Sequence, residues 1–455
     1  MKRILFLLLI SALSFEIGYS QNILQAYVEE GINNNLNTQQ HAANYEKALW
    51  GLKEAKRLYA PSVDFVASYE HLFRKPYDLD RETNNPVLSG LLDFINTLDN
   101  SYIQDGKLYY PARNNYLAGV QLTQTIYNPE LAYNKRMKEA GSRSAQAQLE
   151  DFKTELEAEI QSAYYNYLQA YFVKECVSQS LSLTKKNLRG IENLIAQQKV
   201  TKEVLYKART NVSNRKAQLH NAENKETKAR NYFNFLLNRP LDSSIEIDAA
   251  YIYEQSIKYE LGQEFTSNPD NEYRLSHIRG MMDYTTAEQN RIRANALPKI
   301  QFGALAGYRG TRLDFEQGRN YIGQIQLSLK WNLFNSGVNK AKARQAAFQF
   351  GGLKLQYEQQ ENQLALNEMN ALNDVTTELK NYTSVKDSYN NASVYYSVVE
   401  QKFGQGMATI LELTDAEEQL LQSDANNYTW YYQLLIQTAN YQKTTGKTIK
   451  IISIK

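Results

Sequence analysis

Residues 120–128 read Val-Gln-Leu-Thr-Gln-Thr-Ile-Tyr-Asn, and no proline occurs between residues 130 and 239. Apolar side chains alternate with Gln and Thr along 120–126, which is the period-two pattern of a strand with one apolar face. A long stretch without proline favours helix. The sequence therefore predicts an amphipathic strand that leads directly into a very long helix.

This junction occurs twice in the chain. The motif Leu122-x-x-x-Ile126 is followed by Tyr-Asn, and Leu329-x-x-x-Leu333 is followed by Phe-Asn. A nearly constant separation of matching residues indicates a tandem duplication, with about thirty extra residues between the two strands of the first copy. The matched pairs are Asn128 and Asn335, Leu205 and Leu413, and Asn231 and Asn440, which are 207, 208 and 209 residues apart.

Each copy is expected to contain a helix, two strands around a loop, and a long helical hairpin. The first copy spans 21–240, with strands at 60–71 and 116–127, a loop at 72–115 and a hairpin at 130–238. The second spans 241–455, with strands at 298–309 and 321–334, a loop at 310–320, a hairpin at 336–445 and a C-terminal tail. The fold class is thus mainly α with β, internally duplicated.

The long helices carry a one-sided apolar stripe. From Phe152 to Ile195 the stripe residues recur about every 3.5 residues, which is the heptad spacing of coiled coils. A helix from Glu130 to Ala196 would span roughly 100 Å, which is longer than any bilayer is thick. We therefore expect these helices to stand in water and to pack against one another.

The gross properties exclude several classes of function. Residues 1–20 have a basic start, an apolar run and small residues at the end, so we expect a signal peptide and an exported protein. The chain has 51 Lys and Arg against 49 Asp and Glu, which argues against a nucleic-acid partner.

Catalytic, cofactor and metal sites are not expected. The four His are scattered without metal-ligand spacing, and the sequence has neither a glycine-rich phosphate loop nor a G-x-S-x-G elbow. Cys176 is the single cysteine, which excludes an intrachain disulfide, and its apolar helical context predicts a buried structural thiol. We expect a protein that is not an enzyme.

Four strands cannot close a barrel by themselves, because about eight are needed before the interior can hold side chains. Strands that enter a membrane must therefore pair with those of other copies, in a dimer, a trimer or a tetramer. The alternative is a small soluble sheet on a coiled-coil protein. Aromatic residues at the strand margins favour the barrel, where they would lie at the membrane interfaces: Tyr69, Tyr116, Tyr308, Tyr321 and Trp331.

The order of motifs, present twice, resembles the TolC-type outer-membrane efflux family over nearly the whole mature chain. The motifs are Ala60-Pro61-Ser62-Val63, the stretch 120–128, Val204-Leu205-Tyr206-Lys207-Ala208 and Leu236-Leu237-Asn238-Arg239-Pro240. The resemblance implies a homotrimer with a twelve-stranded β-barrel in the outer membrane and a periplasmic α-barrel. Residues 241–270 and the tail from Gly446 would lie in a belt around that tube.

The resemblance also implies a role and partners. Such a protein is the exit duct of a tripartite efflux or type I secretion system, and docks onto a periplasmic adaptor and an inner-membrane transporter. The substrates would be drugs, metal ions or secreted proteins. Two rivals remain open: a self-contained porin, which needs many more strands per chain, and a periplasmic coiled-coil adaptor, which has a single hairpin.

The hairpin tips are where a gate and adaptor contacts are expected. Helix breaks at 197–201 and 404–406 mark the tips, with Val200, Thr201, Gly404 and Gly406 as candidate adaptor contacts. Glu412 and Asp415 match acidic residues that the family places at the pore entrance, and a spacing of three puts them on one helix face. The alternative is a solvated charged face next to Glu417 and Glu418.

Overall fold

The computed structural model describes residues 23–73, 77–78, 90, 103–104, 107–108, 114–198, 200–248, 258–263, 272–310, 321–446 and 449–454. The predicted signal peptide and most residues of the two predicted strand-connecting loops lie outside these ranges. The chain divides into two compact units. The sheet unit comprises 48–141 and 282–352, and the hairpin unit comprises 1–47, 142–281 and 353–455.

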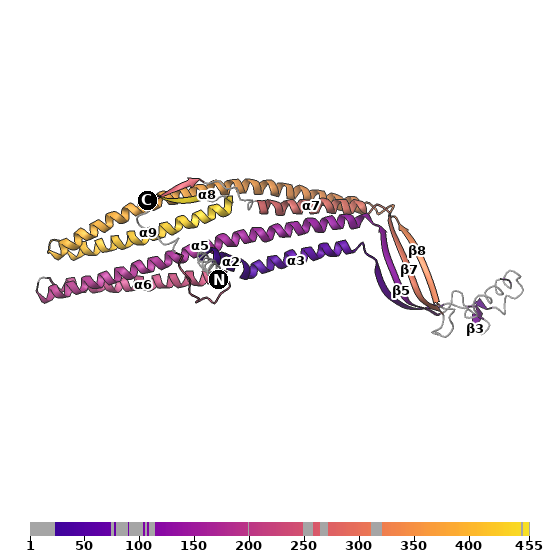
Figure 1. Ribbon diagram of the computed structural model, residues 1–455, viewed down its shortest axis with the longest axis horizontal. Helices are drawn as coiled ribbons and strands as arrows, with labels where there is room; N and C mark the ends of the chain where they lie inside the picture. The colour runs from indigo at the N-terminus through magenta and orange to yellow at the C-terminus, as the bar shows by residue number, and fades with distance from the viewer. Residues whose placement is uncertain are drawn as a thin grey trace, which may run out of the picture. The chain divides into compact units, whose positions relative to one another are not determined.

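The sheet unit contains a four-stranded antiparallel sheet (Figure 1). Its strands are β1 (Ser62–His71), β5 (Asn114–Tyr127), β7 (Lys299–Gly310) and β8 (Tyr321–Lys330), in the order β1-β5-β7-β8. The two copies of the repeat meet in the middle of this sheet, where β5 pairs with β7. The prediction of two strands from each copy is confirmed.

The register places the apolar residues of all four strands on one face. Phe65 lies opposite Val120, and Ala304 lies opposite Ile325. The other face is mostly polar, with Gln121, Gln301 and Gln326 among its members. The apolar face comprises Val63, Phe65 and Ala67 of β1, Ala118, Val120 and Leu122 of β5, Phe302, Ala304 and Ala306 of β7, and Ile325, Leu327 and Leu329 of β8.

One predicted strand boundary is wrong. The strand expected over 321–334 ends at Lys330, and residues 331–335 have no regular structure. The physical reason is pairing, because Lys330 lies opposite Lys299, the first residue of β7. Beyond Lys330, β8 has no further strand residue of β7 with which to pair.

The long helices form two hairpins. In the first, α5 (Pro129–Ala196) is followed by α6 (Lys202–Leu236), and in the second, α8 (Val338–Gly404) is followed by α9 (Ile410–Thr445). The two members of each pair lie side by side in Figure 1. Three shorter helices precede the strands: α2 (Ile23–Asn34), α3 (Leu36–Arg57) and α7 (Glu272–Ala294). No described helix is long and apolar enough to span a membrane.

The core of the hairpin unit is built from the heptad stripe. The predicted stripe residues Leu156, Ile160 and Ala163 are at most 2% exposed. They pack in one cluster with the aromatic rings of Phe233 and Tyr432, which are fully buried. Residues from α2, α5, α6, α8 and α9 contribute to this cluster, so each hairpin buries its stripe against the other.

A small second sheet joins two segments that are far apart in the sequence. Strand β6 (Lys258–Gln263) pairs antiparallel with β9 (Ile449–Ile454). These strands come from the segment 241–270 and from the tail, which the family resemblance places in one belt. Their pairing brings the two segments together within the hairpin unit.

Close packing of β5 against β7 requires glycine at position 307. A Cβ atom on Gly307 would overlap the carbonyl oxygen of Ala118, and a Cβ on Gly119 would lie 2.7 Å from that of Ala306. Backbone atoms cannot move aside without distorting the sheet. We expect Gly307→Ala to lower the free energy of unfolding by about 1–3 kcal/mol.

Gly323 of β8 provides the matched control, since a Cβ there meets no atom within 4 Å. Gly323→Ala should change stability by less than about 0.5 kcal/mol. The measurement is denaturant unfolding of both variants in the same detergent. Equal stability of the two variants would show that β5 and β7 are not held this closely.

Candidate functional site at the hairpin tips

Both hairpins reverse direction through a residue in the left-handed region. Gln198 has φ 56° in the first tip and Gly406 has φ 74° in the second. The predicted tip residues Val200 and Thr201 lie between α5 and α6, while Gly404 is the last residue of α8. The structure thus places all four candidate adaptor contacts at the turns, and their role stays a prediction.

The helices that leave the two tips begin differently. Thr409 starts α9 with a capping box: its hydroxyl accepts a hydrogen bond from the Glu412 N–H at 3.2 Å, and its own N–H donates to the Glu412 carboxylate at 2.6 Å. Thr201 starts α6 without a side-chain cap, and its hydroxyl instead bonds the carboxylate of Glu203. The first copy therefore does not reproduce the cap of the second.

The two candidate gate carboxylates are exposed and have local partners. Hydrogen bonds from the backbone and then the hydroxyl of Thr409 lower the pKa of Glu412. Asp415 accepts a hydrogen bond from the Gln419 amide at 2.8 Å. Both carboxylates are therefore accessible to solvent and to ions near the second tip, and Glu412 additionally stabilises the start of α9.

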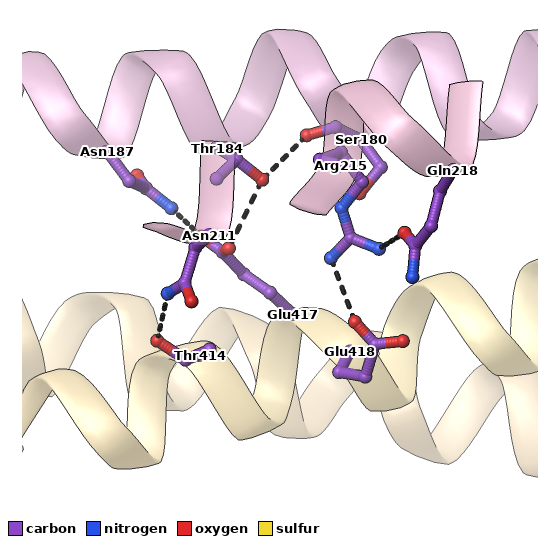
Figure 2. A network of polar contacts seen from close by, with 9 residues as sticks. All are labelled: Ser180, Thr184, Asn187, Asn211, Arg215, Gln218, Thr414, Glu417 and Glu418. Atoms are coloured by element: carbon purple, nitrogen blue, oxygen red, sulfur yellow. Dashed lines mark hydrogen bonds and ion pairs between the residues drawn. The ribbon is translucent and has the colours of Figure 1, made fainter. Parts of the chain in front are cut away.

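Glu417, which is close to these two carboxylates in the sequence, is buried instead of solvated. This residue is only 5% exposed, and its carboxylate lies between α9 and α5 (Figure 2). The Asn187 amide donates to one of its oxygens, and the Thr184 hydroxyl lies 3.3 Å from the other. Burial raises the pKa of Glu417, while the Asn187 bond and then the charge of Arg215 oppose that rise.

A second set of polar contacts joins α6 to α9. Arg215 is 5% exposed, and its guanidinium lies 3.1 Å from the carboxylate of Glu418 and 2.7 Å from the amide oxygen of Gln218. Nearby, the Asn211 amide donates to the Thr414 hydroxyl at 2.9 Å. The first hairpin is thus tied to the second by side-chain bonds on both of its helices (Figure 2).

Sequence reasoning missed this inter-hairpin network, which comprises Thr184, Asn187, Asn211, Arg215, Thr414, Glu417 and Glu418. A signal was present, because Arg215 continues the buried series Ala208 and Val212 at helical spacing. A charged residue at an apolar stripe position needs a partner from another element. The sequence does not say which element supplies it.

Cys176 is buried as predicted, next to a carboxylate. Burial, and then the Asp424 carboxylate that its thiol contacts, raise its pKa far above the ordinary value. The burial of the side chain confirms the prediction of a buried thiol. No group of three or more His, Cys, Asp or Glu side chains placed to hold a metal occurs among the described residues.

The predicted interface aromatics lie at the two ends of the apolar face of the sheet. Tyr69 and Tyr116 stack with ring centroids 4.8 Å apart, and Tyr308 and Tyr321 meet edge to face at 6.5 Å. Trp331 follows β8 at the opposite end, where its indole N–H donates to the carbonyl of Ala296 at 3.0 Å. Their membrane role stays a prediction.

The number of hydrogen-bond donors around the Glu417 carboxylate leads to a testable prediction about stability. The single hydroxyl proton of Thr184 faces two acceptors, the Ser180 carbonyl at 2.9 Å and Glu417 at 3.3 Å. A neutral side chain at position 417 can itself donate to Thr184, so both acceptors are satisfied. We expect Glu417→Gln to be more stable than wild type at neutral pH by roughly 1 kcal/mol.

The pH dependence has a definite sign. Folding raises the pKa of Glu417 above its ordinary 4.5, so the ionised carboxylate makes the folded protein less stable at neutral pH. As the pH falls from neutral toward 4.5, Glu417 takes up a proton and wild type regains that stability. The stability gap between Glu417→Gln and wild type should therefore shrink on acidification. Thermal unfolding at several pH values measures it, with the exposed Glu361→Gln as control. A gap independent of pH would contradict the assignment.

Comparisons with known proteins agree with this architecture. Residues 282–447 match the family model described as "Outer membrane efflux protein". Over 98% of its length the chain is 21% identical to the outer membrane protein TolC of Escherichia coli (strain K12), of which 87% is covered.

Solved structures share the fold. The CmeC outer membrane channel of Campylobacter jejuni superposes with a TM-score of 0.74 at 15% identity, covering 93% of this chain and 85% of that one. The outer membrane protein VceC of Vibrio cholerae gives 0.72 at 16% identity, covering 93% and 96%. The duplicated architecture of helical hairpins and four strands is therefore that of known outer-membrane channels.

These findings confirm the sequence-based predictions of family, fold class and outer-membrane location. The family match covers residues 282–447 of the second repeat, and the first repeat joins the second in one sheet and one core. The chain is thus similar to outer membrane efflux proteins of the TolC type, and the family model matches it over residues 282–447.

Proposed function

We propose that three copies of this chain form the exit duct of a tripartite efflux or type I secretion system. The duct passively conducts substrates that an inner-membrane transporter and a periplasmic adaptor deliver. One observation carries the proposal: a sheet with an exposed apolar face whose outer strands, β1 and β8, have no further partner among the described strands. Such a sheet is suited to a lipid environment once its edges are paired.

The large exposed fractions of the apolar side chains support a lipid-facing role for this face of the sheet. Phe65, Ile325 and Leu327 are 75%, 78% and 71% exposed in the single chain. Exposed apolar side chains in such number mark a surface that another apolar phase covers. Pairing β8 of one copy with β1 of the next would satisfy both edges, and three copies would give a twelve-stranded barrel. The choice of three comes from the family resemblance.

The helices offer a second surface for neighbouring copies. Along its part in the hairpin unit, α8 exposes Leu355, Met369 and Val394, each at least 64%. A helix that exposes large apolar residues is suited to packing against another helix. The same assembly that closes the barrel would bury this row.

The inter-hairpin network is suited to holding a gate shut. Its bonds join the two hairpins close to their tips, where Val200, Thr201, Gly404 and Gly406 would meet the adaptor. Breaking them would free one hairpin to move against the other. The carboxylates of Glu412 and Asp415, repeated by symmetry, would form acidic rings that attract cations at the entrance.

The test of the function is the conductance of the purified oligomer in planar bilayers, with and without a candidate adaptor. Discrete, voltage-driven conductance steps are the expected result. A protein that stays monomeric and never inserts would contradict the proposal. A conducting preparation that is monomeric would favour the self-contained porin instead.

Arg215→Gln tests the gate. The substitution removes an ion pair between hairpins, so the open probability should rise severalfold. Arg209→Gln is the control, because Arg209 and Glu192 pair at 3.7 Å within the first hairpin. Single-channel recordings measure both. If Arg215→Gln assembles normally and conducts like Arg209→Gln, the network does not hold the gate.

The acidic rings are tested by Glu412→Gln combined with Asp415→Asn. Removing two carboxylates per copy should weaken the block by added multivalent cations and lower cation selectivity. The double variant Glu358→Gln with Glu361→Gln, on the exposed surface of α8, loses the same charge elsewhere. Unchanged block in the first variant would leave Glu412 as a helix cap only.

A further inference from the structure

Positive charge is concentrated where the helices of the sheet unit join the strands. Four segments, 53–57, 129–138, 291–299 and 338–344, carry three Lys or Arg each. Together they contain only two carboxylates, Glu54 and Glu130. The whole chain is nearly balanced, so this basic belt is a local feature of the helix ends that adjoin the sheet.

Two segments of the belt enclose a groove of about 600 Å³ between α7 and α8. Its lining includes Arg293 from α7, and Lys340, Arg344 and Phe348 from α8. The Gln289 amide donates to the Ala343 carbonyl at 3.3 Å, which holds the two helices together at the groove. The groove is therefore formed by consecutive helical turns on both sides.

The three cations of the groove have no ion pair within the part of the chain that the structure describes, and all three side chains are exposed. Elsewhere in the belt, by contrast, Lys299 lies 2.8 Å from Glu130. The Arg344 guanidinium lies over the Phe348 ring at 5.9 Å, and that ring is 72% exposed. Three unneutralised cations beside an exposed ring suit an anion that carries apolar groups.

The groove begins where the apolar face of the sheet ends. Trp331 bonds the carbonyl of Ala296, which is itself a lining residue. The connector after β8 exposes Leu333 and Phe334 at 78% and 83%. An indole and exposed apolar side chains next to cations are the pattern found at the headgroup level of a membrane.

We propose that the groove binds the phosphate headgroup of an anionic glycerophospholipid in the periplasmic leaflet of the outer membrane. Arg293, Lys340 and Arg344 surround the phosphate, and the acyl chains follow Leu333 and Phe334. The proposal rests on the proposed insertion of the sheet into the membrane. A second copy is a poorer occupant, because its own helix ends at this level are equally basic.

Binding fixes the depth of the oligomer in the membrane. The apolar face by itself permits sliding along the membrane normal, whereas charged contacts to phosphate act at one level. Because the contacts are electrostatic, the preference for anionic lipid falls as the salt concentration rises.

The experiment is lipid retention by the intact oligomer after transfer from mixed vesicles of phosphatidylglycerol and phosphatidylcholine, read by native mass spectrometry. Wild type should retain phosphatidylglycerol preferentially, and the triple variant R293Q/K340Q/R344Q should lose that preference by about tenfold or more. The control K185Q/R189Q/K207Q removes the same charge from exposed positions in the hairpin unit. It should behave as wild type.

Four results would overturn the lipid site. Equal retention of both lipids by a wild-type oligomer that conducts would do so while leaving the duct intact. Displacement of the lipid by millimolar inorganic phosphate would identify a free-anion site. Dissociation of the triple variant into monomers would assign the groove to the contact between copies. A wild type that neither inserts nor conducts would refute the duct as well.

Discussion

The structure depends on the backbone N–H and C=O groups along the outer edges of its four-stranded sheet, which need hydrogen-bond partners. β1 and β8 each present one edge that pairs with no other described strand, and the sheet between them has an apolar face. In hydrocarbon an unpaired edge is too costly to persist, so under the proposed function the sheet would have to insert and assemble at the same time. The duplication explains why four strands are available, since each copy supplies one pair and β5 meets β7 at the seam.

The strands and the core stripe of the helices could be predicted from the sequence because their apolar residues recur at regular spacing. Period two located the strands, and heptad spacing located the stripe that contains Leu156 and Ile160, both buried in the core. The end of β8 could not be read, because it is set by where β7 begins and not by the residues 331–334 themselves. Their alternating apolar character continues past the last paired residue.

The network between the hairpins could not be read for a related reason. Glu417 stands in a run of acidic residues that looks solvated, yet it is buried against Thr184, which is 233 residues away in the sequence. Whether a carboxylate is buried depends on what another element brings to it, and a local pattern holds no such information. Glu412 and Asp415, whose partners lie within four residues, could be anticipated far more readily.

The unequal helix starts at the two tips bear on how a partner would recognise the assembly. Thr409 is locked by a reciprocal cap, whereas the Thr201 hydroxyl is turned to a neighbouring carboxylate. A threefold ring of this chain would present six tips that alternate between a stiff and a looser kind. A docking protein could therefore distinguish the first-copy tips from the second-copy tips. It would then bind in only three equivalent orientations around the ring axis, one for each subunit, instead of six, one for each hairpin.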